Sequence, residues 1–172
     1  MEAFLKSIER QAYRIALVGT RLDADALDLV QDSMLRFVTK YARKPQQQWK
    51  PLFYQILHNS IRDYHRRRKA GNRWLSWLTS VEDSEEDPLE NLSDPRQRGA
   101  EHEVQLSGAF AQLEQELKDL PFRQQQAFLL RAWEELSVAE TAAVMNCSEG
   151  SVKTHYFRAL ERLRERLGDH WP

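Results

Sequence analysis

Apolar residues recur at three- and four-residue spacing along the first third of the chain, a pattern typical of amphipathic helices. Such stripes run from Phe4 to Ala16, from Leu27 to Tyr41 and from Phe53 to Tyr64. They predict three helices that share one small core, with the third helix at about 52–68. The residues of the second stripe that are expected to face the core are Leu27, Val30, Met34, Phe37, Val38 and Tyr41.

Four more helical patterns occupy the C-terminal part of the chain. The first extends to Leu120, and Pro121 follows where the first turn of a helix accepts proline. The last two patterns form a helix-turn-helix. The chain is therefore predicted to be all-α, with two small helical domains at residues 1–73 and 101–172.

Residues Ser137 to Leu167 carry the local signals of this helix-turn-helix. Ser137 and Glu140 are spaced as a capping box, Asn146 tolerates the left-handed conformation of a sharp turn, and Ser148 can cap the last helix. The outer side of that helix carries cationic and hydroxyl groups, which suit a helix that enters the major groove of DNA. From this stretch alone, a capped helical hairpin in an all-α core is the alternative.

Charge is nearly balanced overall but uneven along the chain. The formal net charge is −1, yet basic residues gather at the end of the third predicted helix and again in the last helix. Seven acidic residues between Glu82 and Asp94 form a run without lysine or arginine. Residues 74–100 are therefore predicted to be a flexible acidic linker. The apolar patch Trp74–Leu78 within it is expected to dock on the chain itself or on a partner.

Sequence motifs of enzyme chemistry are absent. There is no HExxH, nucleophile elbow or phosphate-binding glycine loop, and the five histidines lack metal-ligand spacing. Cys147 is the single cysteine, which excludes an intrachain disulfide and a CxxC metal pair. We expect no enzymatic activity, no cofactor and no metal. No signal-peptide core or membrane-spanning run occurs, so a cytoplasmic protein without membrane insertion is expected.

Several segments, taken in order, carry a family likeness: Asp25–Arg36, Phe53–Tyr64, Leu120–Pro121 and Cys147–Lys153. They resemble motifs of the bacterial sigma factors of RNA polymerase, specifically the small extracytoplasmic-function (ECF) class of the sigma-70 family. The resemblance covers nearly the whole chain. It implies an alternative sigma factor that binds core enzyme, directs it to specific promoters and opens the minus-ten element. The inhibitory and middle domains of larger sigma factors have no room in 172 residues.

The resemblance assigns roles to three groups of residues. Those expected to bind core polymerase are Asp28, Gln31, Asp32 and Arg36. Those expected to contact the minus-ten element are Trp49, Asn59, Arg62, Asp63 and Arg66. Those expected to contact the minus-thirty-five element are Ser148, Gly150, Ser151, Lys153, Thr154, Phe157 and Arg158. Without the family in view, the polymerase-binding group is an ordinary solvated face.

Physical chemistry agrees with the assignment to the third helix. Asn59 and Asp63 are four residues apart and share a helix face. An amide can donate to and accept from a base edge, whereas the neighbouring arginines suit phosphates. The glutamine-rich loop at residues 42–51, with Trp49, is where the resemblance places a flipped base of the melted strand. A solvated surface amide at Asn59 and a plain solvated loop are the alternatives.

The partners implied by the resemblance are core RNA polymerase, through its beta-prime clamp helices and beta flap, and promoter DNA. An anti-sigma factor is a candidate third partner, and the free chain is expected to be a monomer. Roughly thirty linker residues at ~3.3 Å each span up to ~100 Å, more than the ~70 Å of two duplex turns between the promoter elements. The alternative function is a helix-turn-helix regulator that acts without core polymerase.

Overall fold

The computed structural model describes residues 1–76 and 108–168, with side chains for residues 1–70 and 111–168. These ranges are almost entirely helical and contain no strand, which confirms the prediction of an all-α chain. The elements in chain order are α1 (Glu2–Thr20), α2 (Asp23–Tyr41), the 3-10 turn η1 (Gln46–Gln48), α3 (Trp49–Ser76), α4 (Gly108–Lys118), α5 (Phe122–Phe128), the π-helical turn η2 (Leu129–Trp133), α6 (Val138–Met145) and α7 (Glu149–Leu167).

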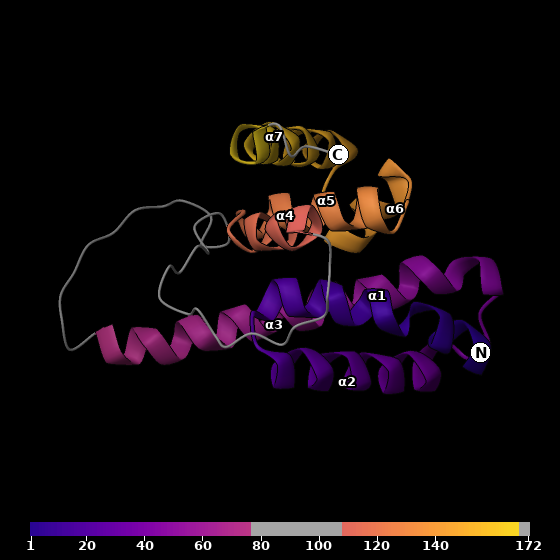
Figure 1. The fold of residues 1–172 in the computed structure, drawn as a ribbon. Coiled ribbons are helices and arrows are strands. Elements are labelled where there is room, and N and C mark those ends of the chain that lie inside the picture. Colours follow the sequence, from indigo (N-terminus) through magenta and orange to yellow (C-terminus); the bar gives the residue numbers. More distant parts are fainter. Residues whose placement is uncertain (77–107, 169–172) are drawn as a thin grey trace.

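Helices α1, α2 and α3 pack together into an N-terminal module, residues 1–76 (Figure 1). Its core is aromatic: Phe37 of α2 is fully buried, and its ring centroid lies 6.3 Å from that of Trp49 and 5.9 Å from that of Phe53. Helices α1 and α3 approach closely because Gly19 has no side chain. A Cβ atom there would meet Cγ2 of Ile61 at 2.8 Å.

Two residues of the predicted inward stripe on α2 are instead exposed. Leu27 is 44% exposed and Val38 is 40% exposed. Both stand at the edges of the stripe, while Val30 and Phe37 along its centre are buried. Within the described part of the chain, α2 packs mainly against α1 and α3, so the region that buries its side chains is narrower than the sequence pattern predicts.

Helix α3 is longer than the predicted 52–68 at both ends. It begins at Trp49 because Pro51 occupies the first turn, where a helix needs no backbone N–H. It continues past Gly71 to Ser76, three residues into the predicted linker. The rest of that linker with its acidic run, and the side chains of the Trp74–Leu78 patch, lie outside the described residues.

Helices α4 to α7 form a C-terminal module, residues 108–168, around a second apolar core. Helix α5 packs against α7, and Leu117 of α4, Leu129 of η2 and Leu163 of α7 are fully buried in this core. Pro121 stands one residue before the first residue of α5, at its N-cap position. The chain then passes through η2 into the helix-turn-helix formed by α6 and α7.

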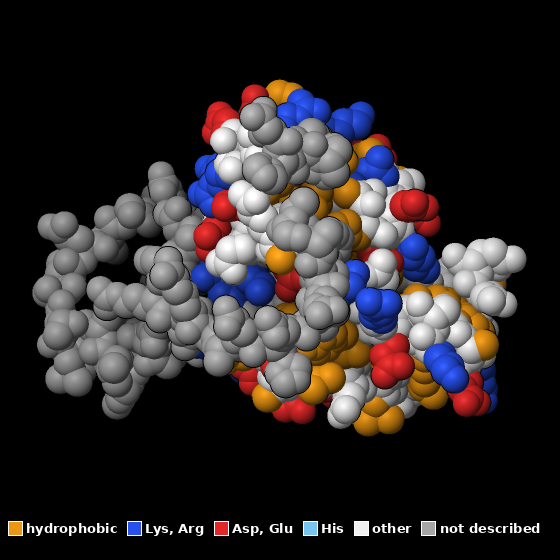
Figure 2. All heavy atoms as spheres, viewed as in Figure 1, with side chains coloured by type: hydrophobic (Ala, Val, Ile, Leu, Met, Phe, Trp, Pro, Cys, Tyr) orange, Lys and Arg blue, Asp and Glu red, His pale blue; other side chains and the backbone are white. Residues whose placement is uncertain are grey.

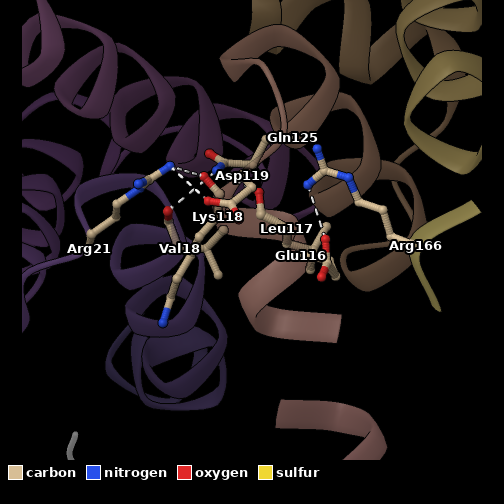
Figure 3. Close-up of polar contacts among 8 residues, drawn as sticks. All are labelled: Val18, Arg21, Glu116, Leu117, Lys118, Asp119, Gln125 and Arg166. Atoms are coloured by element: carbon tan, nitrogen blue, oxygen red, sulfur yellow. Dashed lines mark hydrogen bonds and ion pairs between the residues drawn. The ribbon is translucent and has the colours of Figure 1, made fainter. Parts of the chain in front are cut away.

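The two modules lie directly against each other. Helix α6 packs on α3, and α4 packs on the end of α1 (Figure 1). At the α1 end, the guanidinium of Arg21 reaches the carbonyl of Lys118 and the carboxylate of Asp119, while the Gln125 amide donates to the carbonyl of Val18 at 3.4 Å (Figure 3). From the sequence, we predict two separate domains, and this contact is not among the predictions.

Candidate nucleic-acid and partner interfaces

The outer face of α7 has the composition expected of a DNA-reading helix. Lys153, Thr154 and Arg158 are exposed, and Phe157, also on this face, is 60% exposed. Lysine and arginine side chains gather over α7 at the top of the molecule (Figure 2). Buried residues on the opposite side, among them Val152, fix this helix to the module. The face therefore offers charged, hydroxyl and apolar contacts to a groove at once.

Side-chain caps start both α6 and α7, as the sequence predicts. The Ser137 hydroxyl accepts from the backbone of Glu140, and the Glu140 carboxylate accepts from the backbone of Ser137 at 2.8 Å. These hydrogen bonds hold the pKa of Glu140 below its ordinary value. Asn146 is left-handed with φ 51, and the Ser148 hydroxyl accepts from the backbone N–H of Ser151 at 3.1 Å. The capping box, the turn residue and the second cap are all confirmed.

Smaller residues of the α7 group make local contacts. The Ser151 hydroxyl lies 2.8 Å from that of Ser148, and the Thr154 hydroxyl donates to the carbonyl of Gly150 at 3.0 Å. Gly150 and Ser148 are exposed, and Ser151 is half-buried. The hydroxyl oxygens keep lone pairs for a second partner.

The predicted minus-ten residues on α3 share one solvent-facing side of that helix. Arg66 is exposed, whereas Asn59, Arg62 and Asp63 are half-buried. The Arg66 guanidinium pairs with the Asp63 carboxylate at 3.3 Å. An exposed pair of this kind contributes little, so a phosphate can displace the carboxylate at small cost.

Trp49, assigned to the same group, lies in a different setting. Its ring packs on Phe4 with centroids 5.5 Å apart and on Phe37, and its indole N–H donates to the carbonyl of Lys44 at 2.7 Å. The residue thus joins the core of the module and fixes the shape of the loop. A base that stacks on its ring would compete with these contacts.

On α2, the predicted polymerase-binding residues form a polar face. Asp28, Gln31 and Arg36 are exposed, Asp32 is half-buried, and Arg36 pairs with Asp32 at 2.8 Å. Leu35, which the sequence pattern did not single out, stands beside them and is 68% exposed.

Hydrophobic side chains appear along the lower edge of the molecule, over α2 (Figure 2). An apolar groove of about 470 Å³ between α1 and α2, lined by Leu5, Met34 and Val38 among others, continues this surface. A contiguous exposed apolar area rimmed by polar residues is a feature of protein-binding faces.

The candidate faces of α3 and α7 are not brought together. Helices α5 and α6 lie between α7 and α3, so the two faces point away from a shared site (Figure 1). The described residues thus form a two-module helical protein with a helix-turn-helix, α6 and α7, and with separate exposed faces on α2, α3 and α7.

Comparison with known proteins shows the family to which the chain belongs. The family model of Sigma-70 region 2 matches residues 1–71, and that of Sigma-70, region 4, matches residues 110–163. The chain is 34% identical to the RNA polymerase sigma-E factor of Streptomyces antibioticus over 143 residues, which cover 83% of this chain and 71% of that protein. The chain belongs to the ECF class of the sigma-70 family of RNA polymerase sigma factors.

Other proteins agree with this placement. RNA polymerase sigma factor SigV of Bacillus subtilis is 28% identical, with 90% of this chain and 83% of that protein covered. The sigma factor RpoE of Bartonella quintana, solved in complex with the anti-sigma factor NepR, has the same fold. Its TM-score is 0.62 at 24% identity, with 97% of this chain and 98% of that chain covered.

Membership in this family decides between the two functions that the sequence left open. As a sigma factor, the chain has core RNA polymerase and promoter DNA as its partners, and the helix-turn-helix regulator that acts without core polymerase is excluded. Among the described helices, none is long and apolar enough to cross a membrane.

Proposed function

We propose that the three exposed faces divide the work of promoter-specific initiation. The α2 face binds core polymerase, the α3 face with its preceding loop contacts and opens the minus-ten element, and the α7 face reads the minus-thirty-five element as duplex. The observation that carries this proposal is the placement of two separate DNA-type faces and one protein-type face on the matched regions. Catalysis stays with the polymerase.

Support for the α2 assignment comes from its mixed chemistry. Charged residues around Asp32 alternate with exposed leucines at positions 27 and 35, and an apolar groove adjoins them. Protein interfaces combine an apolar centre with a polar rim in this way. By resemblance, we assign the clamp helices of the beta-prime subunit to this face and the beta flap to the C-terminal module.

Reversing the polarity of the α2 face should weaken core binding. Replacing Gln31 and Asp32 by lysine is expected to raise the Kd for core polymerase about tenfold or more, because like charges then oppose the partner surface. Titration of labelled protein with purified core enzyme measures this. The control carries the same charge change on exposed residues of the C-terminal module, Gln112→Lys with Glu135→Lys. Equal affinity of the two double variants would disprove the placement.

The two DNA faces should fail in different ways. Lys153→Ala is expected to weaken holoenzyme binding to duplex promoter and to lower the slope of log affinity against log salt by about 1, since one phosphate contact is lost. Asn59→Ala should leave duplex binding intact and impair strand opening. Filter binding and permanganate footprinting separate these steps, and each variant is the control for the other. Normal melting by Asn59→Ala would remove α3 from the proposal.

The same proposal extends to the oligomeric state of the chain, its cellular location and a further protein partner. We propose that the free chain is a monomer and that it acts with core polymerase in the cytoplasm. We also propose an anti-sigma factor as a further partner, supported by the resemblance and by the fold shared with RpoE. Light scattering of the purified chain tests the first statement.

A further inference from the structure

Helix α3 has a different neighbour on each of its sides. On one side, His58 stacks on Phe122 of α5 with ring centroids 5.4 Å apart, and its Nδ1 atom lies 3.3 Å from the amide oxygen of Gln126. This side therefore faces the C-terminal module. The solvent-facing side carries the α3 residues assigned to the minus-ten element. The third side faces α2, and the contacts of Tyr64 on it belong to none of the three exposed faces described above.

A chain of hydrogen bonds joins three side chains on this third side. The Tyr64 hydroxyl donates to the Asp25 carboxylate at 2.6 Å, and the guanidinium of Arg68 donates to the same hydroxyl at 2.7 Å. The central carbon of that guanidinium also lies 5.6 Å from the centroid of the Tyr64 ring, which is a cation–π distance. Tyr64 thus holds the guanidinium of Arg68 through both its hydroxyl and its ring.

The Tyr64 hydroxyl keeps the proton that this chain of hydrogen bonds needs. Burial raises the pKa of Tyr64 above its ordinary value, and the hydrogen bond to Asp25 acts in the same direction, whereas Arg68 lowers it. The neutral hydroxyl has one proton to donate to the carboxylate and lone pairs to accept from the guanidinium. All three side chains are half-buried, so water competes only in part for these hydrogen bonds.

The three bonded side chains stand beside the most basic turn of α3. Arg66, Arg67, Arg68 and Lys69 follow one another without an acidic residue between them. Arg66 and Arg67 are exposed, and they lie three and four residues beyond Asp63, on the solvent-facing side. Successive residues turn by roughly 100° around a helix, so Arg68 adjoins Arg67. Arg68 is therefore the cation at the border between the solvent-facing side of α3 and the side that faces α2.

A guanidinium that is held in place suits contact with a phosphate. Its five N–H donors form a planar fork that matches phosphate oxygens. A freely moving arginine side chain must be immobilised when it binds, and this ordering lowers the affinity. The ring and hydroxyl of Tyr64 already order the side chain of Arg68 in the unbound protein, so less freedom is lost when a phosphate is bound.

We propose that Arg68 contacts the DNA backbone beside the minus-ten element, and that Tyr64, oriented by Asp25, is a positioning residue for this contact. The inference deepens the proposed role of α3 and rests on it. The run of four cations favours a phosphate over a protein partner. Core polymerase, whose proposed binding face includes Asp28, three residues after Asp25, is the competing partner that the test excludes.

A double-mutant cycle on the holoenzyme separates positioning from packing. Tyr64→Phe removes the hydroxyl and keeps the ring, whereas Arg68→Ala removes the guanidinium. The probe is a promoter fragment, selected by run-off transcription, that is unpaired over the minus-ten element, so strand opening does not enter the affinity. We expect Tyr64→Phe to weaken binding about fivefold in the parent and to have no effect in the Arg68→Ala chain. Equal losses in both backgrounds would show that Tyr64 acts through packing alone and would overturn the inference.

The salt dependence of the same affinities identifies the phosphate contact. Arg68→Ala should lower the slope of log affinity against log salt by roughly 0.7–1, the value for one phosphate. Tyr64→Phe keeps the charge and should keep the slope while it loses affinity. Arg10→Ala makes the same charge change at an exposed position of α1, outside the three faces, and should leave the slope as in the parent. An unchanged slope for Arg68→Ala would rule out the contact.

A second variant leaves Tyr64 in place and tests the guanidinium itself. Arg68→Lys keeps the positive charge but replaces the planar fork by an ammonium on a flexible stem. It should bind the same fragment about fivefold more weakly than the parent, with the parent's salt slope. Affinity equal to that of the parent would show that any cation suffices at this position and would contradict a positioning role for Tyr64.

Titration with purified core polymerase tests the competing partner. Tyr64→Phe and Arg68→Ala should bind core enzyme as tightly as the parent does. A tenfold loss of core affinity by Arg68→Ala would assign this residue to the polymerase instead and would refute the DNA contact. A failure of the proposed function has another signature: strand opening by Asn59→Ala and the salt slope of Arg68→Ala would then both equal those of the parent. If the inference alone is wrong, Asn59→Ala still impairs opening.

Discussion

Replacing Phe37 by alanine is expected to lower the free energy of unfolding by about 3–5 kcal/mol, the range for loss of a buried phenylalanine. The side chain is fully buried at the centre of the aromatic core, where it contacts rings from α1, α2 and α3. Urea unfolding followed by circular dichroism measures the change.

A control on the same helix makes this result specific. Leu35 is 68% exposed, so Leu35→Ala removes apolar atoms from α2 without opening a cavity and should change stability by less than about 0.5 kcal/mol. A loss below 1 kcal/mol for Phe37→Ala, or equal losses for both variants, would contradict the described packing of α2.

Acidification is expected to open the contact between the modules. In the packed state, burial lowers the pKa of His58 from 6.5 to about 4. The hydrogen bond to Gln126 raises this pKa, whereas the charges of Arg62 and Arg123 lower it further. Separation of the modules exposes the imidazole and returns its pKa toward 6.5. The open state therefore binds more protons as the pH falls below 6.5, and closure weakens between pH 6.5 and 4.

The size of this effect follows from the two pKa values. His58 alone should shift the ratio of closed to open molecules about tenfold between pH 7.5 and 5.5. His65, whose pKa is also lowered to about 4, adds to the shift as far as opening exposes it. Burial is the largest cause of the lowered His65 pKa. A hydrogen bond to the Gly19 backbone raises this pKa, whereas the positive charges of Arg21, Arg68 and Lys69 lower it.

The distance between spin labels on α2 and α7, followed against pH, measures this opening. His58→Gln keeps a polar side chain facing Phe122 and Gln126 but cannot take up a proton, so its pH dependence should be flatter. His155→Gln, on α7, removes a histidine from a helix that packs on α4, α5 and α6 and should behave like the parent. A His58 pKa near 6.5 in the closed protein, measured by nuclear magnetic resonance, would refute the expectation.

The helix-turn-helix could be predicted from sequence because its signals are local. The caps and the turn are formed by hydrogen bonds between residues at most four apart in the chain. The spacing of the residues that form them, Ser137, Glu140, Asn146 and Ser148, therefore specifies these features. The edges of α2 could not be predicted in the same way. Periodicity gives the direction of a stripe but not the width that neighbouring helices cover, which is why Leu27 was placed inward.

The contact between the modules could not be predicted from the periodicity of the sequence, for a different reason. Many of its side chains are of types that are usually solvated, such as Gln55, His58 and Gln126. The contact therefore leaves no apolar stripe in the sequence. One signal was present: three consecutive glutamines, residues 124–126, stand in a short helix that is otherwise apolar around its buried side. Polar residues on every side of a buried helix indicate a partner across it.

Arg21 couples the C-terminal end of α1 to the other module. The residue ends α1 in the left-handed conformation, with φ 63, where glycine would be less strained by about 1 kcal/mol. Glycine would have no guanidinium to reach Lys118 and Asp119 across the module boundary. The backbone strain at position 21 thus falls on α1, while the contacts that offset it are made with the other module.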